Sequence, residues 1–473
     1  MIIWDLIVKI KINKLYFNFK ERFKMGRLFG TDGVRGIANS ELTSELVMKI
    51  GRAAAMVLTD SDHRHPKILI GKDTRLSSDM LEGALIAGLC SVGANVEILG
   101  VIPTPAVAFL VGKYKAAAGI MISASHNPYK FNGIKIFSGD GYKLPDALEE
   151  EIEDIILNDD VDLFLPTGDG LGKVTYAKNA VRDYINHVKS TVPFALDGMN
   201  IAFDCANGAS SATTRMLFGE LGANCHILHD KPNGININDA CGSTHMESLA
   251  AYVVENNLDL GIAFDGDADR CLAVDDKGEL VDGDLIMAIC AQDMLSRGKL
   301  SKKTVVGTVM TNMGFAKFCK ASGINFIPTK VGDRYVLEEM LQEDYNLGGE
   351  QSGHVIFKDF STTGDGQLTA AQLLSLLKRR EAKLSDLRNI MTKYPQVMKN
   401  VKVSADGKLH FYTNRDVKQK IEDTKQDLAD TGRVVVRVSG TEPLIRVMLE
   451  GEDLDRIDNL ADQIVEVVRE QLS

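Results

Sequence analysis

The sequence predicts an α/β protein with three similar α/β domains, whose sheets are mixed and largely parallel, and a C-terminal α+β domain. Two observations predict this class. The chain has 473 residues, which is about three domains of ordinary size, and one strand–loop–helix–strand pattern occurs three times in it. Hydrophobic residues make up 45% and charged residues 25%, which is typical of globular proteins and excludes a fibrous or largely disordered chain.

The repeated pattern first occurs near the N-terminus. An apolar strand, Ile68–Ile70, and a polar loop precede a helical spacing of leucines over Leu81–Leu89. Gly93 follows, and a glycine after a helix readily adopts the left-handed conformation that ends it. A second strand, Val96–Leu99, completes the unit. A helix between two strands implies a crossover connection and parallel pairing.

The two later copies have the same order of strand, loop, helix, glycine and strand. One copy comprises Ile201–Phe203, Asp204–Gly208, Met216–Leu217, Gly222–Asn224 and Cys225–Leu228; the other comprises Val305–Val309, Phe315–Phe318, Gly323–Asn325 and Phe326–Ile327.

The C-terminal region has a different pattern. Two apolar runs, Arg433–Val438 and Leu444–Leu449, flank Ser439–Pro443, which predicts a β-hairpin with a five-residue loop. A helix rich in Ile, Leu and Val is expected over Leu454–Val468. The expected domains are residues 25–180, 181–280, 281–390 and 391–473.

Residues 1–24 differ from the rest because they mix apolar residues with six basic ones. Asp5 and Lys9 interrupt the apolar run, and no small-residue cleavage site follows, so a signal peptide is not predicted. The segment is expected to be an appendage, or to come from an upstream start codon, with Met25 as the native start. A basic amphipathic membrane anchor is the alternative.

The net charge bears on the class of binding partner, and the cysteines bear on the cellular compartment. The chain has 54 Lys and Arg against 65 Asp and Glu, and this net charge of −11 argues against nucleic acid as a partner. No apolar stretch approaches 18 residues, so no membrane span is expected. The seven cysteines are odd in number and scattered, without C-x-x-C. They predict free thiols in the cytoplasm, with no disulfide framework and no zinc site.

A candidate nucleophile lies in the loop Ala124–Pro128, directly after the apolar run Gly119–Ile122. Residues of these types disfavour continued strand, which places Ser125 at a strand end, where α/β folds bind ligands. A serine nucleophile needs an acid/base partner, and His126 and Lys135 are both candidates. The G-x-S-x-G motif of one hydrolase class is absent. An ordinary polar turn is the alternative.

A candidate metal site follows the apolar run Leu260–Phe264. Asp265, Asp267 and Asp269 stand at alternate positions, and three such carboxylates converge only around a positive charge. Arg270 occupies the position where a calcium loop requires glycine, so Mg²⁺ is the expected ion. The alternative is a solvated acidic turn.

Three further loops have groups that suit a phosphorylated sugar. Gly348–His354 offers hydrogen-bonding groups for sugar hydroxyls or an amine, although a polar turn would look the same. The hairpin loop carries small donors between two arginines, which suits a phosphate dianion. Gly30–Gly36 is a glycine-rich loop with one arginine. With no Walker A motif in the chain, these loops, the serine and the aspartates together indicate metal-assisted phosphoryl transfer to or from a phosphorylated sugar.

At these motifs the sequence resembles the α-D-phosphohexomutase family. The resemblance extends from Leu28 to the C-terminus, and its motifs occur in the family's order: Gly30–Gly36, the Ser125 loop, Asp265–Asp269, Glu350–His354 and Ser439–Thr441. It implies four domains around a central cleft and Ser125 carried as phosphoserine. It also implies one Mg²⁺ per subunit, held by the Ser125 phosphate with Asp265, Asp267 and Asp269.

The resemblance also implies an activity. Within the family, Phe29–Gly36, Lys330–Arg334 and Gln351 favour an isomerase that interconverts glucosamine 6-phosphate and glucosamine 1-phosphate. The intermediate and activator would be glucosamine 1,6-bisphosphate, and the product would lead to UDP-N-acetylglucosamine and cell-wall precursors. The only expected partners are the sugar phosphate and a second subunit in a homodimer.

The implied roles fall into three groups. The catalytic residues would be Ser125, Lys135 and His354. The sugar would contact Glu350, Ser352, Lys330 and Arg334. Phosphate would contact Arg437, Ser439, Gly440, Thr441, Arg446, Arg35 and Arg270.

Three other functions are left open at this point. The first is a member of the same family that acts on mannose or glucose phosphates. The second is a metal-dependent phosphatase with an aspartate nucleophile at Asp265 or Asp267. The third is a non-catalytic phosphosugar sensor, which intact Ser125, Lys135 and aspartates argue against.

Overall fold

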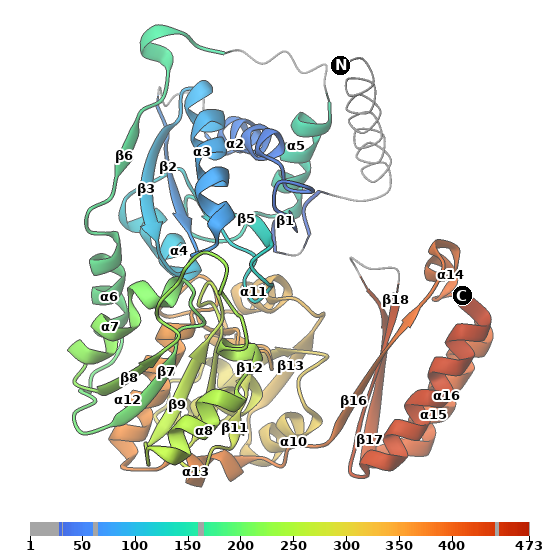
Figure 1. Cartoon of the computed structure of the whole chain (residues 1–473). Helices are drawn as coiled ribbons and strands as arrows, with labels where there is room; N and C mark the ends of the chain where they lie inside the picture. Colours follow the sequence, from blue (N-terminus) through green and yellow to red (C-terminus); the bar gives the residue numbers. More distant parts are fainter. Residues whose placement is uncertain (1–27, 31, 60–64, 159–164, 440–443, 473) are drawn as a thin grey trace, which may run out of the picture.

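The computed structural model describes residues 28–30, 32–59, 65–158, 165–439 and 444–472. The expectation for residues 1–24 therefore lies outside the described residues. Four sheets follow one another along the chain (Figure 1). No helix in the described ranges is long and apolar enough to cross a membrane. All seven cysteines are described and carry free thiols.

The first sheet has six strands in the order β1-β5-β4-β2-β3-β6. β2, β3, β4 and β6 run parallel, whereas β5 is antiparallel to both β4 and β1. The strands are β1 Val34–Ile37, β2 Lys67–Lys72, β3 Asn95–Val101, β4 Ala118–Ile122, β5 Phe131–Ser138 and β6 Val174–Tyr176, and the helices are α2 Ser44–Leu58, α3 Leu76–Ser91, α4 Thr104–Lys113 and α5 Asp146–Leu157.

The second and third sheets repeat this plan. Their orders are β11-β10-β9-β7-β8 and β13-β12-β14-β15, and in each sheet three adjacent strands are parallel. The second unit has β7 Asn200–Asp204, β8 Asn224–Leu228, β9 Leu260–Phe264, β10 Cys271–Asp275, β11 Leu280–Val281, α6 Ala180–Ser190, α7 Thr214–Glu220 and α8 Glu247–Glu255. The third has β12 Thr304–Thr308, β13 Asn325–Thr329, β14 Leu347–Gly349, β15 Val355–Phe357, α9 Gly283–Ser296, α10 Met313–Ser322, α11 Asp333–Gln342 and α12 Gly366–Arg380.

The C-terminal unit is an antiparallel sheet with helices on one face. Its order is β16-β18-β17, and the open face of the sheet is turned toward the other units (Figure 1). The elements are β16 Gln396–Lys402, β17 Gly432–Val438, β18 Leu444–Gly451, α14 Ala405–His410, α15 Arg415–Leu428 and α16 Leu454–Leu472, and the short α13, Leu384–Leu387, precedes them.

The predicted fold class is confirmed. Each copy of the repeat forms the expected strands and helix, and Gly93, Gly222 and Gly323 all have the positive φ that ends a helix turn. The hairpin strands lie where they were expected, and the last helix continues four residues past Val468.

The hydrophobic core joins the first three units. One continuous cluster includes residues of α4 in the first unit, β7 and β9 in the second, and α9 and α12 in the third. The C-terminal unit has a separate core between its sheet and α15 and α16. The first three units are therefore fixed by apolar packing, whereas the fourth depends on a smaller contact.

That contact is a buried polar joint around Glu450 on β18. Glu450 is fully buried, pairs with Arg433 and accepts hydrogen bonds from Asn312 Nδ2 at 3.2 Å and Met313 N at 3.0 Å. Arg433 in turn donates to the carbonyl oxygens of Val309 and Thr311. The C-terminal unit is thus attached to the start of α10 by a charged pair whose hydrogen-bonding groups are occupied.

Asp284, in the first turn of α9, contacts Asn312 of this joint. Its Oδ2 accepts a hydrogen bond from Asn312 N at 2.8 Å, whereas its buried Oδ1 has no partner among the described residues. Burial and the neighbouring carboxylate of Asp282 raise the pKa of Asp284 to about 8. The folded protein therefore keeps a proton that the unfolded chain loses near pH 4.

This proton predicts a pH-dependent effect of Asp284→Asn. Between the two pKa values the folded state binds more protons, so Asp284 lowers stability as pH rises from about 4 to 8, and the effect then levels off. We expect the Tm of the variant relative to the parent to be several degrees higher at pH 8 than at pH 5, because 1 kcal/mol shifts Tm by about 2–4 °C in domains of 150–250 residues. Calorimetry at both pH values tests this, and a Tm difference that does not change with pH would contradict it.

Candidate active site

Ser125 lies in the tight connection between β4 and β5. Its side chain is 1% exposed and its φ is +51°, a left-handed conformation that is uncommon for residues other than glycine. The Ser125 amide donates to Ser123 Oγ at 2.9 Å, and Ser123 Oγ donates to Asp73 Oδ2 at 2.6 Å. Such a conformation persists only where surrounding contacts impose it.

Arg75 supplies most of these contacts. Its side chain is buried, and Nε pairs with Asp73 at 2.8 Å. The two terminal nitrogens donate to four carbonyl oxygens of the loop, those of Ser125, Asn127, Pro128 and Phe131. From the second unit, Asn238 Nδ2 donates to the carbonyl oxygens of Ser125 at 2.9 Å and Asn127 at 3.1 Å. Arg75 and Asn238 were not predicted from the sequence, because neither stands in a motif that identifies its partner.

The three aspartates of the second unit gather opposite Ser125. They follow β9, are at most 4% exposed, and each offers an oxygen within 4.8 Å of the others. Oδ1 of Asp267 and Oδ1 of Asp269 are buried without a hydrogen-bond partner in the described ranges. Ser125 Oγ donates to Asp265 Oδ2 at 2.5 Å. Unpartnered buried carboxylate oxygens beside a hydroxyl are the donor set that a hard divalent cation takes.

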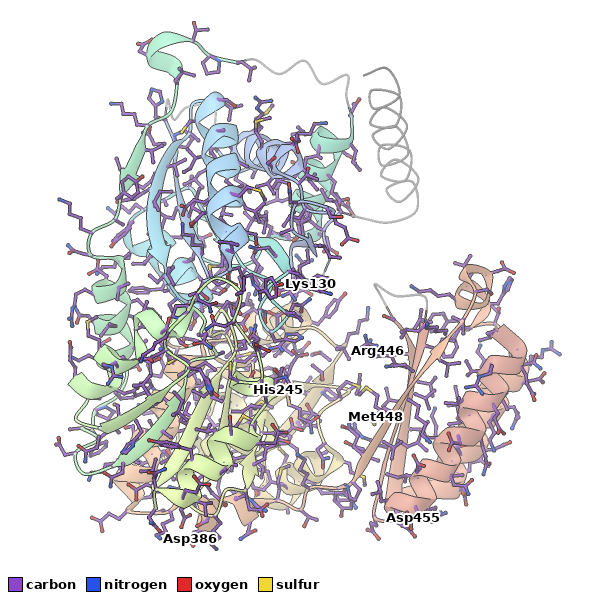
Figure 2. The ribbon with its side chains drawn as sticks, in the orientation of Figure 1. Lys130, His245, Asp386, Arg446, Met448 and Asp455 are labelled. Atoms are coloured by element: carbon purple, nitrogen blue, oxygen red, sulfur yellow. The ribbon has the colours of Figure 1, made fainter. Side chains whose placement is uncertain are left out.

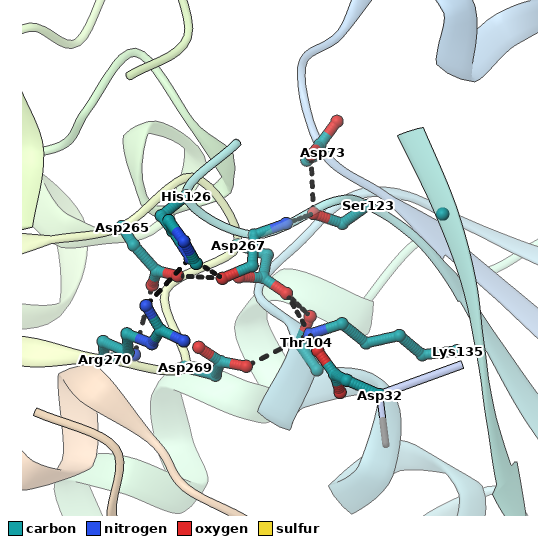
Figure 3. A network of polar contacts seen from close by, with 12 residues as sticks. Asp32, Asp73, Thr104, Ser123, His126, Lys135, Asp265, Asp267, Asp269 and Arg270 are labelled. Atoms are coloured by element: carbon teal, nitrogen blue, oxygen red, sulfur yellow. Dashed lines mark hydrogen bonds and ion pairs between the residues drawn. The ribbon is translucent and has the colours of Figure 1, made fainter. Parts of the chain in front are cut away.

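Lys135 on β5 balances part of this negative charge. Nζ lies 2.8 Å from Asp267 Oδ2 and 3.1 Å from Asp269 Oδ2, and Asp32 adds a third contact at 3.1 Å (Figure 3). Burial alone would lower the pKa of Lys135, but the three carboxylates together raise it well above the ordinary value. Lys135 is therefore a cation and a potential proton donor in this site.

The charges also fix the states of two aspartates. Burial together with Asp269 and Asp267 raises the pKa of Asp265 well above its ordinary value. Burial opposes the ionisation of Asp269, but Lys135 holds its pKa at about 2. Asp265 is thus the carboxyl whose ionisation most needs a further positive charge.

His126 and Arg270 lie on the other side of the aspartates (Figure 3). Burial, together with Arg270 and Arg35, lowers the pKa of His126 to about 4, so its ring is neutral at physiological pH. Nδ1 of His126 is 3.4 Å from Ser125 Oγ but 2.8 Å from Arg270 Nη1, which occupies its lone pair. This occupied nitrogen makes His126 a weaker candidate than Lys135 for proton transfer.

The predicted sugar-binding residues come from the third unit. Glu350 Oε1 accepts a hydrogen bond from Gly332 N at 3.2 Å, and burial and Asp333 raise the pKa of Glu350. Ser352 Oγ and His354 Nδ1 are buried and lack partners among the described residues. These groups are available to a ligand.

Lys330 and Arg334 are placed differently. Lys330 is exposed, and its ammonium lies 5.5 Å from the Tyr335 ring. Arg334 reaches the first unit, where it pairs with Glu149 at 3.0 Å and contacts Asp146 and the Leu144 carbonyl oxygen. Arg334 therefore binds the first unit to the third in this structure.

The predicted phosphate-binding arginines lie on the C-terminal sheet. Arg437 on β17 is paired directly across from Arg446 on β18. Figure 2 labels Arg446 on this sheet. Burial and Arg446 lower the pKa of Arg437, whereas the Glu350 carboxylate of the third unit acts in the opposite direction. Ser439 is buried, and its amide donates to the Leu444 carbonyl oxygen. Gly440 and Thr441 lie outside the described residues. Of the other two predicted phosphate contacts, Arg35 pairs with Asp32 and Arg270 lies beside the aspartates.

Comparisons with known proteins give one consistent family. Four models described as phosphoglucomutase/phosphomannomutase match the chain: alpha/beta/alpha domain I over residues 26–162, domain II over 182–278, domain III over 282–394 and the C-terminal domain over 398–467. Phosphoglucosamine mutase of Clostridium acetobutylicum is 54% identical over 94% of this chain and 100% of its own. Phosphoglucosamine mutase of Caldanaerobacter subterraneus is 56% identical over 95% and 100%.

Solved structures show the same fold. A phosphoglucomutase/phosphomannomutase family protein from Burkholderia thailandensis has a TM-score of 0.78 at 23% identity, covering 94% of this chain and 98% of its own. N-acetylphosphoglucosamine mutase of Aspergillus fumigatus, solved with GlcNAc-6P and magnesium, has a TM-score of 0.65 at 17% identity, covering 94% and 96%.

The contacts of Arg75 predict a specific loss of order in Arg75→Lys. Lysine keeps a charge for Asp73 but cannot replace the planar set of donors to the four carbonyl oxygens. We expect backbone amides of residues 123–131 to exchange with deuterium at least tenfold faster than in the parent. As a control, Arg182→Lys alters an exposed pair with Glu220 and should leave this exchange unchanged. Equal protection of the loop in parent and Arg75→Lys would contradict this role for Arg75.

Proposed function

The chain belongs to the phosphoglucomutase/phosphomannomutase family, and we propose that it interconverts glucosamine 6-phosphate and glucosamine 1-phosphate through a phosphoserine enzyme. The choice of sugar is supported by curated phosphoglucosamine mutases that are 54% and 56% identical over almost the whole chain. The chain is an intramolecular phosphotransferase of the isomerase class. These relatives do not favour mannose or glucose phosphates as the main substrate.

One observation carries the proposed mechanism: Ser125 Oγ lies 2.5 Å from Asp265 Oδ2, beside three buried carboxylates. A serine hydroxyl that can hold a phosphoryl group next to an oxygen-lined cation site suits phosphoryl transfer. We therefore assign Ser125 as the residue that carries the phosphoryl group. This assignment predicts an acid-stable phosphoserine, whereas a phosphatase with an aspartate nucleophile would form a labile acyl phosphate.

Mg²⁺ would be held by Asp265, Asp267, Asp269 and the phosphoryl group on Ser125. The unpartnered oxygens of Asp267 and Asp269 fit this role. When bound, the ion supplies positive charge to the phosphoryl oxygens. Arg270 and Arg35 lie close enough to the aspartates to act on the same charge, which suits stabilisation of the transferring group.

Lys135 and His354 are the proposed proton carriers. The C1 hydroxyl of glucosamine 6-phosphate attacks the phosphorus on Ser125, and the bond from phosphorus to Ser125 Oγ breaks. The hydroxyl proton passes to His354 Nδ1, and Lys135 donates a proton to Ser125 Oγ. In the second half of the reaction, the 6-phosphoryl group returns to Ser125, Lys135 takes back its proton, and His354 protonates O6. Both residues end in their starting states.

The sugar must present each end to the same serine in turn. Glu350, Ser352 and Lys330 would bind its hydroxyls and amine, and a buried carboxylate such as Glu350 suits an ammonium group. Arg437 and Arg446 with Ser439, Gly440 and Thr441 would bind whichever phosphate lies away from Ser125. Since the C-terminal unit has its own core, its movement would open and close the site around the 1,6-bisphosphate. Arg334 would add a sugar contact if the first and third units separate.

Ser125→Ala tests the nucleophile. We expect mutase activity to fall by at least a thousandfold, and phosphate to disappear from the peptide that contains residue 125. Ser40→Ala, at an exposed serine, is the control. It should keep mutase activity and the phosphate on the peptide that contains residue 125. Kinetics with added sugar bisphosphate and peptide mass spectrometry supply the measurements. Near-full activity in Ser125→Ala would rule out the phosphoserine mechanism.

The sugar preference can be measured directly. We expect kcat/KM for glucosamine 6-phosphate to exceed the values for mannose 6-phosphate and glucose 6-phosphate by at least tenfold. The reason is that an uncharged hydroxyl group cannot replace the positively charged ammonium group beside Glu350. In Glu350→Gln, kcat/KM for glucosamine 6-phosphate should fall by a larger factor than kcat/KM for glucose 6-phosphate, so the preference should shrink. Comparable values for the three sugars in the parent protein would contradict the assigned substrate.

A further inference from the structure

A second group of side chains of metal-ligating types shares no residue with the aspartates of the active site. Asp204 ends β7, His229 follows β8, and Cys241 directly precedes the short helical turn Gly242–Thr244. One donor atom from each residue lies within 4.8 Å of the other two. Asp204 and Cys241 are fully buried, and about a third of the His229 side chain is exposed.

The position of this group in the sheet is that of a ligand site. β7 and β8 are parallel neighbours (Figure 1), and Asp204 is paired to Leu228. Asp204 and His229 therefore emerge together from the carboxyl ends of the two strands. Asp265 emerges from the same edge of the sheet, since β9 is the other parallel neighbour of β7. Ligands in α/β folds bind at this edge.

Backbone hydrogen bonds hold the Asp204 side chain and the segments that carry His229 and Cys241 in place independently of any ion. Asp204 accepts hydrogen bonds from Ala206 N at 2.8 Å and Gly242 N at 2.9 Å, and Asn207 N donates to the His229 carbonyl oxygen at 2.7 Å. At Gly242, where φ is +74°, a Cβ atom would lie 2.6 Å from Ala206 Cβ. Only glycine lets the segment with Cys241 come this close to the β7 loop.

We propose that Asp204, His229 and Cys241 form a second metal site that takes Zn²⁺ or a similar borderline cation, with water as the fourth ligand. One oxygen, one nitrogen and one sulfur donor suit such an ion, whereas the active-site aspartates offer oxygen alone. A carboxylate and a thiolate neutralise the two positive charges in a buried place.

The distances require only side-chain adjustments. Tetrahedral zinc, with bonds of about 2.1 Å to N and O and about 2.3 Å to S, needs donor separations of about 3.4–3.6 Å. His229 Nδ1 is 3.0 Å from Asp204 Oδ2, and the whole set spans no more than 4.8 Å. A thiol binds such an ion as the thiolate, so binding would release the Cys241 thiol proton to solvent.

The same segment connects this site to the serine loop. Asn238 N donates to the Ala206 carbonyl oxygen at 2.9 Å, and the Asn238 side chain donates to the Ser125 carbonyl oxygen. Thr74 Oγ1 of the first unit donates to the Asn207 carbonyl oxygen at 2.5 Å. An ion that joins the Asp204, His229 and Cys241 segments would therefore stiffen the support of the serine loop without touching the substrate.

Cobalt spectroscopy of the full-length protein distinguishes this site from the aspartates. With metal stripped and excess Mg²⁺ present, one equivalent of Co²⁺ should produce a near-ultraviolet thiolate-to-cobalt band, and Zn²⁺ should remove it. The aspartate cluster has no sulfur and cannot give this band. Cys241→Ser should abolish the band, whereas Cys225→Ser, at a partly buried thiol on β8, should keep it.

Two further variants keep the test decisive. His229→Asn, at a partly exposed position, should weaken Co²⁺ affinity at least tenfold even if Cys241→Ser fails to fold. Asp267→Asn should leave the band unchanged, because it alters only the active-site aspartates, so this result is separate from the outcome for the proposed function. No band at one equivalent, or a band that survives both Cys241→Ser and His229→Asn, would overturn the proposal.

Discussion

The ion pairs of Lys135 with Asp267 and Asp269 join the first unit to the second at the centre of the molecule. Lys135 comes from β5 and the aspartates follow β9, so each unit supplies part of the charge that balances the buried groups of the other. A buried carboxylate without a partner costs several kcal/mol, on the order of the whole stability of a domain. Docking of the two units and assembly of the site are therefore one event, and the continuous apolar core across them holds the charged groups within 3.1 Å.

The sequence predicted those parts of the structure that depend on local pattern. Apolar runs and glycine stops located the strands of all three repeats, because period and turn chemistry act within a few residues. Ser125 and the aspartates follow strands of neighbouring units, and the structure brings them together, as α/β topology predicts for strand ends. Arg75 and Asn238 were missed, since a lone polar residue gives no sign of a partner 50 or more positions away. Arg334 was expected at the sugar, and its contacts with the first unit depend on which surface lies nearest in three dimensions.

The C-terminal unit differs from the others in how it is attached. The first three units share one core, whereas this unit has its own and is connected through Glu450, Arg433 and the start of α10. Directional contacts allow rotation about a small area more readily than interdigitated apolar packing does. The proposed phosphate contacts on this unit and the proposed nucleophile on the first unit together suit a substrate that must turn around between two transfers.

Stability and activity favour different residues at position 125, because the backbone of Ser125 is left-handed. Glycine would adopt a φ of +51° without strain and would relieve the cost that Arg75 and Asn238 now offset. Selection for stability alone would therefore favour glycine at this position, whereas selection for activity retains serine. Directed evolution of this protein toward heat resistance would be expected to lose Ser125, the proposed nucleophile, early unless turnover is selected in the same screen. The stability–activity trade-off would then lie in a single residue.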